Sequence, residues 1–96
     1  MHVISKKKLK YFWEQHAESR KPLEAWFKIV RSSRYRTLSE LRMTFPKADK
    51  VGHAIVFDIG GNKYRLIAVI HFNRFKVYVR YVLTHEEYDK GAWRNG

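Results

Sequence analysis

The chain has 96 residues and no cysteine, and its 20 Lys and Arg against 9 Asp and Glu leave a formal net charge of +11. This length predicts a single domain over residues 1–96, and the absence of cysteine excludes both disulfides and a cysteine-based zinc site. The charge exceeds the magnitude of about 2–8 that is usual for a small domain, so we expect a polyanionic partner, nucleic acid before a membrane surface or an acidic protein.

The first half of the chain predicts a short strand and three helices. Residues 1–4 alternate like a strand, and Ser5 offers an N-cap for a helix over residues 6–19. Apolar residues at helical spacing mark one face of this helix and one face of a second helix that begins near Pro22. These faces are formed by Leu9, Phe12, Trp13 and His16, and by Leu23, Trp26, Phe27 and Val30. Thr37 and Glu40 form the capping pattern of a third, short helix, which Pro46 ends.

From residue 52 the apolar period changes to two, which predicts strands over residues 53–59, 63–72 and 75–83. Asn73–Arg74 is interpreted as a two-residue turn with positive φ at Asn73. The three strands form an antiparallel meander, with the N-terminal strand added at a position that the pattern does not fix. The predicted fold class is therefore α+β: a helical hairpin and a short helix packed on one face of a small, mainly antiparallel sheet.

Alternation divides the predicted sheet into two faces. The helix-facing set includes Tyr64, Leu66, Ala68, Ile70, Val77, Val79 and Tyr81. The other face presents Lys63, Arg65, His71, Lys76, Tyr78 and Arg80 around an apolar patch of Ile67, Val69 and Val82. A basic, partly aromatic open sheet is typical of an RNA-binding surface, although ordinary polar alternation on a half-exposed sheet is the alternative.

The stretch LTHEEYDKG, residues 83–91, gathers His85, Tyr88 and Asp89 at the end of the last strand. These residues either solvate a strand end or form half of an active site. Cleavage of RNA through its own 2′-OH needs a base, an acid and a cation at the phosphate. Histidine suits proton transfer and arginine suits the phosphate. Tyr88 can donate a proton or stack on a base, and Asp89 can orient His85 or only balance local charge.

The order MHVIS, FPKAD, FDIGGNKYRLIAVIHF and VYVRYVLTHEEYDK resembles the HigB-type toxins of bacterial toxin–antitoxin modules, within the RelE-like superfamily. The resemblance covers essentially the whole chain, and its most specific pieces are GNKYRLI and THEEYDK. It implies a microbial-RNase-like fold, an mRNA endonuclease that works without a metal or other cofactor, often on the 70S ribosome, and a HigA-like helix-turn-helix antitoxin. It also implies that Arg65 meets the scissile phosphate, and that His85 and Tyr88 belong to the active site.

Two further groups of cations are expected to contact RNA, namely the first-helix lysines Lys6, Lys7 and Lys8, and Lys90 in the tail. The lysine run otherwise forms a solvated helical face. His2, His16 and His53 are interpreted as structural. The beginning of the chain lacks the apolar segment of a signal peptide, and the run LIAVI is too short to cross a bilayer, so we expect a cytoplasmic location without membrane contact. The alternative function is a non-catalytic RNA- or ribosome-binding module.

Overall fold

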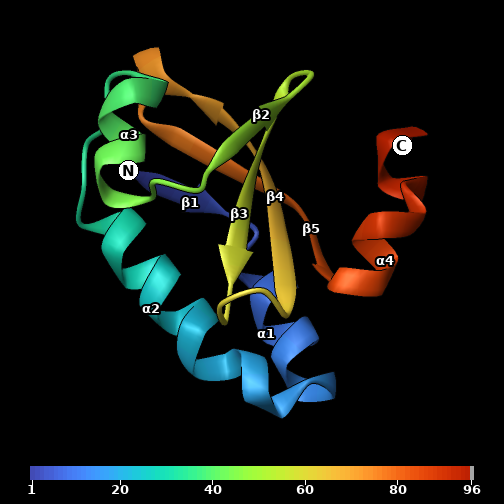
Figure 1. Cartoon of the computed structure of the whole chain (residues 1–96). Coiled ribbons are helices and arrows are strands. Elements are labelled where there is room, and N and C mark those ends of the chain that lie inside the picture. Colours follow the sequence, from blue (N-terminus) through green and yellow to red (C-terminus); the bar gives the residue numbers. More distant parts are fainter. Residues whose placement is uncertain (96) are drawn as a thin grey trace.

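The computed structural model describes residues 1–95 and has four α-helices and one five-stranded sheet in that range (Figure 1). The strands are β1 His2–Ile4, β2 Asp49–Val51, β3 Ala54–Ile59, β4 Tyr64–His71 and β5 Lys76–Thr84. The helices are α1 Lys6–Gln15, α2 Arg20–Arg31, α3 Leu38–Thr44 and α4 His85–Lys90. The sheet order is β1-β5-β4-β3-β2, and only the β1–β5 pair is parallel. The predicted α+β class is therefore confirmed.

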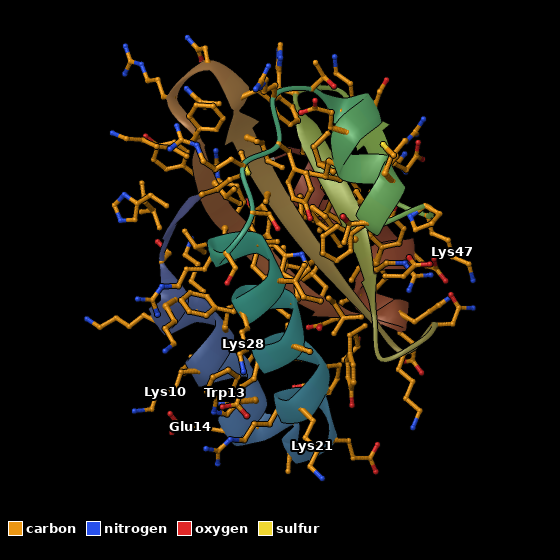
Figure 2. All side chains as sticks on the ribbon, turned by 90° about the vertical axis from the view of Figure 1, so that its left-hand side faces the viewer. Lys10, Trp13, Glu14, Lys21, Lys28 and Lys47 are labelled. Atoms are coloured by element: carbon orange, nitrogen blue, oxygen red, sulfur yellow. The ribbon has the colours of Figure 1, made fainter. Side chains whose placement is uncertain are left out.

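The hydrophobic core lies between the sheet and the first two helices, which form the predicted hairpin. Leu9 and Phe12 of α1 and Leu23 of α2 are buried in the same cluster as Phe57 and Leu66 of the sheet. Two cation–aromatic contacts show that the helices run antiparallel, because Lys6 meets Phe27 and Arg20 meets Trp13, joining opposite ends of α1 and α2. Lys10 and Lys21 project outward from the two helices, and Lys47 projects outward from the segment between α3 and β2 (Figure 2).

The predicted helix ends are correct at α3 and wrong at α1. The Thr37 hydroxyl accepts a hydrogen bond from the Glu40 N–H at 3.1 Å, and α3 ends immediately before Phe45 and Pro46. Ser5 makes no side-chain cap, because the chain turns from β1 into α1 with Ser5 at φ 77°. The first helix also ends at Gln15, and a 3₁₀ turn over Ala17–Ser19 replaces its expected last turn.

Two connections in the sheet also differ from the prediction. The segment before Gly52 adds β2, three residues that pair with β3, and a run this short carries too little alternation to be recognised as a strand. The link between β4 and β5 is a 3₁₀ turn over Phe72–Arg74, not a two-residue turn. The positive φ, 53°, falls on Phe75 and not on Asn73.

A β-bulge in β5 reverses part of the predicted two-face pattern. Ala68 pairs with Val79 whereas Ile67 pairs with Tyr81, so Arg80 is the additional residue. Beyond the bulge the alternation shifts by one position. Tyr81 therefore lies on the open face beside Ile67, and Val82 packs against the helical core, which is the opposite of the predicted assignment.

The N-terminal amine fixes the first strand to the second helix. The Met1 ammonium donates hydrogen bonds to the carbonyls of Val30 and Arg31, at 3.2 and 3.1 Å, where α2 ends. Burial, and then the charge of Arg34, lower the pKa of this amine. Within residues 1–95 no helix is long and apolar enough to cross a membrane.

Candidate active site

The tail that follows β5 forms a short helix, α4, where the sequence suggested only a polar strand end. Thr84 is its N-cap: the Glu87 N–H donates to Thr84 Oγ1 at 3.2 Å, and the Thr84 N–H donates to Glu87 Oε1 at 2.9 Å. Gly91 ends the helix at φ 75°. This Thr-x-x-Glu capping box is readable in the sequence, so the signal for α4 was present.

His85 is the first residue of α4, and Asp89 lies one turn later. His85 Nδ1 is 3.0 Å from Asp89 Oδ2, as expected for side chains at positions i and i+4. The side chains are 44% and 60% exposed, so a substrate can reach them. The His85 N–H also donates to the Lys63 carbonyl at 3.0 Å, which fixes the beginning of α4 against the strand that carries Arg65. Asp89 therefore contacts the imidazole of His85, which is the arrangement required for Asp89 to orient it.

Arg65 lies on β4 directly opposite Asp58 of β3, and most of its guanidinium is already bound. Its Nε is 3.2 Å from Asp58 Oδ1, and its Nη1 donates to the carbonyls of Asn62 and Tyr64 at 3.2 and 3.1 Å. Nη2 donates to Asn62 Oδ1 at 2.9 Å. With its side chain only 11% exposed, Arg65 organises the turn between β3 and β4 in this conformation.

Tyr88 and Trp93 connect α4 to the open face of the sheet. Their rings stack at 5.2 Å with an interplanar angle of 15°, and Trp93 Nε1 donates to the Tyr88 carbonyl at 3.1 Å. The Arg65 guanidinium lies 5.5 Å from the centroid of the Tyr88 ring. Trp93 is buried against Val56 and Ile67, so this segment covers part of the face that the sequence predicted to be open. The position of Trp93 was not predictable, because no periodic pattern surrounds it.

The structure divides the predicted RNA-contacting residues between separate places. His71 and Tyr78 form an edge-to-face pair at the end of the sheet opposite α4, and Lys76 pairs with His71 in the register. Six residues separate Arg65 from His71 along β4, which is about 20 Å at about 3.3 Å per residue. His71, Lys76 and Tyr78 therefore lie away from His85.

The remaining predicted cations lie nearer α4 or on α1. Lys63 is exposed and forms an ion pair with Glu18 at 3.4 Å, and Lys90 is exposed in the last turn of α4. The first-helix lysines do not act as one set: Lys6 lies 4.6 Å from the Phe27 ring centroid, whereas Lys8 Nζ donates to the Arg80 carbonyl at 3.2 Å. Lys7, Lys8 and Arg80 line a groove between α1 and β5. Sequence analysis did not single out Tyr11, which lines the same groove.

Comparison with known proteins identifies the family. A family model described as HigB toxin, the RelE-like toxic component of a toxin–antitoxin system, matches residues 19–91. The chain belongs to the HigB toxin family. It is 33% identical over 92 residues to the mRNA interferase toxin HigB of Escherichia coli strain K12. This alignment covers 93% of this chain and 88% of that relative. It is 30% identical over 93 residues to the mRNA interferase HigB of Escherichia coli O6:H1 strain CFT073, covering 94% of this chain and 90% of that one.

Membership of the HigB family confirms the resemblance inferred from GNKYRLI and THEEYDK. It also implies an antitoxin partner, since the family is one component of a two-part system. The matched range contains Arg65, His85, Tyr88 and Asp89. Helix α1 and Trp93 lie outside that range, so what they contribute must be argued from the geometry of this chain.

Proposed function

We propose that this HigB family toxin is a metal-independent endoribonuclease that cleaves mRNA and so inhibits translation and growth. The observation that carries the proposal is the exposed His85–Asp89 pair at the beginning of α4, beside Tyr88 and Arg65. The names of its relatives, which call them mRNA interferases, support the same activity.

The proposed reaction uses the RNA's own 2′-OH as nucleophile. The 2′ oxygen forms a bond to phosphorus, the bond from phosphorus to the 5′ oxygen breaks, and the products are a 2′,3′-cyclic phosphate and a 5′-OH. A proton leaves the 2′-OH and another is delivered to the leaving 5′ oxygen. Because Asp89 engages Nδ1 of His85, Nε2 is the ring nitrogen that transfers one of these protons.

Arg65 is proposed to stabilise the charge that develops on the phosphate. Asn62 accepts hydrogen bonds from both terminal nitrogens, so a phosphate gripped by both nitrogens must displace contacts of this turn. Asp58 would keep its contact with Nε and aim the guanidinium during the exchange. Tyr88, whose ring lies over the guanidinium, then positions the RNA by stacking or by hydrogen bonding.

The setting of the reaction is also a proposal. We propose that cleavage takes place in the cytoplasm on mRNA held by the translating 70S ribosome, and that a HigA-like helix-turn-helix antitoxin neutralises the toxin. The net charge of +11 supports association with a ribonucleoprotein surface, because a strong basic excess attracts nucleic acid at long range.

The deciding experiment measures the chemistry of the product ends. The purified chain is added to translating ribosomes, and the mRNA fragments are tested for a 2′,3′-cyclic phosphate and a 5′-OH. The same reaction with His85→Gln should yield such ends about 10²-fold or more slowly. A parallel reaction with deproteinised mRNA shows whether the ribosome is required. Unbroken mRNA in every reaction, together with tight RNA binding, would reject the endonuclease.

One observation favours a second candidate, a non-catalytic RNA- or ribosome-binding module. Arg65 is 11% exposed and bound by Asp58 and Asn62, which is what a purely structural arginine requires. This candidate predicts salt-sensitive RNA binding with no change in the RNA, so the same end analysis separates the two.

A further inference from the structure

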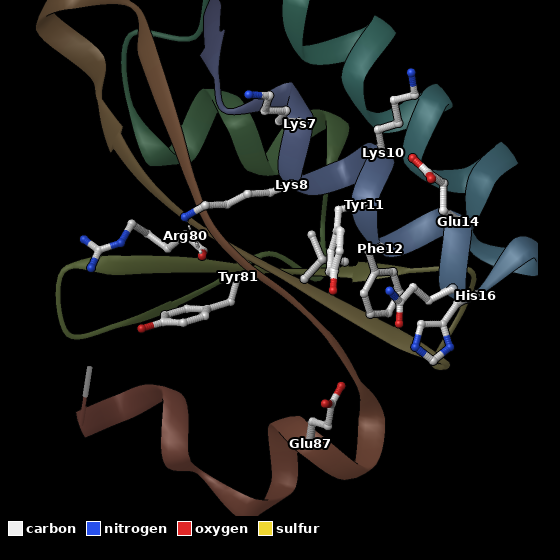
Figure 3. A pocket seen from close by; sticks show the side chains of 12 residues that line it. Lys7, Lys8, Lys10, Tyr11, Phe12, Glu14, His16, Arg80, Tyr81 and Glu87 are labelled. Carbon is white, nitrogen blue, oxygen red and sulfur yellow. Dashed lines mark hydrogen bonds between the residues drawn. The ribbon is translucent and has the colours of Figure 1, made fainter.

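A groove of about 810 Å³ runs between α1 and β5 and reaches the first turn of α4 (Figure 3). Its basic lining consists of Lys7, Lys8, Lys10 and Arg80. Tyr11 and Tyr81 add aromatic surface, and Glu14, Glu87 and the imidazole of His16 also line it. Four basic side chains against two carboxylates give this lining an excess of positive charge. Glu87 is the α4 residue of this lining, two positions after His85, so one end of the groove reaches the helix that carries His85.

The groove exists because β1 is short. β1 pairs only with Lys76–Tyr78, so in the described chain the edge of β5 has no neighbouring strand from Val79 onward. Helix α1 lies along this edge instead, and Lys8 bridges the gap to the Arg80 carbonyl at 3.2 Å. The bulge at Arg80 also brings Tyr81 to the open face, and both residues line a second hollow of about 330 Å³ there. Arg80 and Tyr81 therefore border both the groove and the hollow on the open face of the sheet.

Tyr11 has no role in the core. It is 67% exposed, whereas Leu9 and Phe12 on the same helix are buried. It stands one turn after Lys7 and next to Lys10 in the sequence, and all three residues line the groove. Figure 3 shows the Tyr11 ring pointing into the groove, whereas the Lys10 side chain extends from α1 in the opposite direction. Exposed aromatic rings between cations are how proteins hold single-stranded nucleic acid, because every base has a face that can stack and every nucleotide a phosphate.

We propose that this groove binds single-stranded RNA, with Tyr11 stacking on a base and Lys7 and Lys10 contacting phosphates. The strand then passes Arg80 toward His85. This inference rests on the proposed function, since it describes how the substrate of that site is held. An acidic protein segment is the competing occupant, but the aromatic surface and the continuity with the catalytic end favour RNA.

The test measures binding without cleavage. The probe is a fluorescent single-stranded RNA of about 12 nucleotides with methylated 2′-hydroxyls, a length within the ~4–16 nucleotides typical of such sites. Tyr11→Ala should weaken binding by about 5- to 150-fold, the loss expected for one stacked base, whereas Tyr11→Phe should keep most of it. Lys7→Gln with Lys10→Gln should lower the slope of log K against log salt by about 1.4, or ~0.7 for each lost phosphate contact.

A charge-matched control separates the groove from general attraction. Lys21→Gln with Lys47→Gln removes the same charge from exposed positions that do not line the groove (Figure 2) and should leave binding within about two-fold of the parent. The groove proposal would be overturned if both double lysine variants lost RNA binding equally, or if Tyr11→Ala bound the RNA probe as well as the parent. The proposal would also be overturned if the Tyr11 and Lys7–Lys10 variants lost binding to an acidic protein partner but kept binding to RNA.

Cleavage of unmodified mRNA on ribosomes is scored separately, so the two proposals fail in different ways. If the parent protein binds the probe through Tyr11 but leaves mRNA unbroken, the groove proposal stands and the endonuclease proposal is rejected. If the parent protein cleaves mRNA and the Tyr11→Ala variant binds the probe as well as the parent does, the endonuclease proposal stands and the groove proposal is rejected.

Discussion

Asp58 and Arg65 face each other across β3 and β4, with Oδ1 of the carboxylate 3.2 Å from Nε of the guanidinium. Their side chains are 26% and 11% exposed, so water screens the pair only weakly. The contact leaves the two terminal nitrogens of Arg65 at the turn that contains Asn62. The two strands therefore fix the position of Arg65 through Nε, and the turn between them holds its far end.

Arg65→Ala is expected to reduce mRNA cleavage by about 10²–10³-fold, the loss typical of one electrostatic stabiliser. It should also lower the free energy of unfolding, toward the lower end of the ~3–5 kcal/mol seen when one partner of a buried pair is removed, because Asp58 keeps its charge. Arg65→Lys should restore cleavage only in part, since an ammonium cannot reproduce the guanidinium fork.

The double variant Arg65→Ala with Asp58→Ala separates the two effects of losing Arg65. Removing both charges should recover much of the stability but none of the cleavage. Single-turnover cleavage on translating ribosomes and a thermal melt give the two readouts. Parental cleavage by a folded Arg65→Ala variant would show that the arginine is only structural.

Asn62→Ala tests whether the turn holds Arg65 in a resting state. The substitution removes the side-chain acceptor of Nη2 but keeps the backbone carbonyl that accepts from Nη1. If phosphate must displace Asn62, cleavage should stay at the parental rate or rise. A loss as large as that of Arg65→Ala would mean that Asn62 orients Arg65 for catalysis, which contradicts the proposed exchange.

His85→Gln is expected to lose about 10²-fold or more in cleavage, the range for a missing general acid or base. Its melting temperature should stay close to that of the parent, because the side chain is 44% exposed. Asp89→Asn should lose less, since it keeps a polar partner for Nδ1 but removes the charge. If His85→Gln cleaves mRNA at the parental rate, α4 has only a structural role, and the catalytic residues are expected among Lys63, His71 and Arg80.

Tyr88→Phe and Trp93→Ala should behave differently. Tyr88→Phe keeps the ring that stacks on Trp93 and lies over Arg65, so stability should change little and cleavage should fall only if the hydroxyl matters. Trp93→Ala removes the ring that is packed against Val56 and Ile67, so it should cost about 3–5 kcal/mol of stability, as for a buried aromatic residue. Trp93→Phe should recover part of that loss in a thermal melt.

Thr84→Ala removes the N-cap of α4 and is expected to lower stability by about 1 kcal/mol. Cleavage should fall with it, because α4 holds His85 at its first position. Thr84→Ser keeps the hydroxyl and should restore both properties. If Thr84→Ala cleaves mRNA at the parental rate, the capping box does not position His85.

The sequence by itself determined the fold class, the family and the candidate catalytic residues. Spacing of the apolar residues in α1 and α2 and alternation in β3, β4 and β5 are local signals, and they survive folding because each matches the period of its element. The His85–Asp89 pair was also within reach, since four residues on a helix bring two side chains together. The Thr84–Glu87 capping box could have shown that this stretch is a helix.

Only the tertiary structure decided what depends on contacts between distant segments. One extra residue at Arg80 exchanges the faces of Tyr81 and Val82, and no local pattern records a bulge whose partner lies in another strand. The docking of Trp93 on Ile67 and the binding of Arg65 by Asp58 and Asn62 depend on sheet register in the same way. The lysines of the first helix contact different parts of the molecule, because a helix turns about 100° per residue. This rotation directs Lys6 to Phe27 and Lys8 to Arg80.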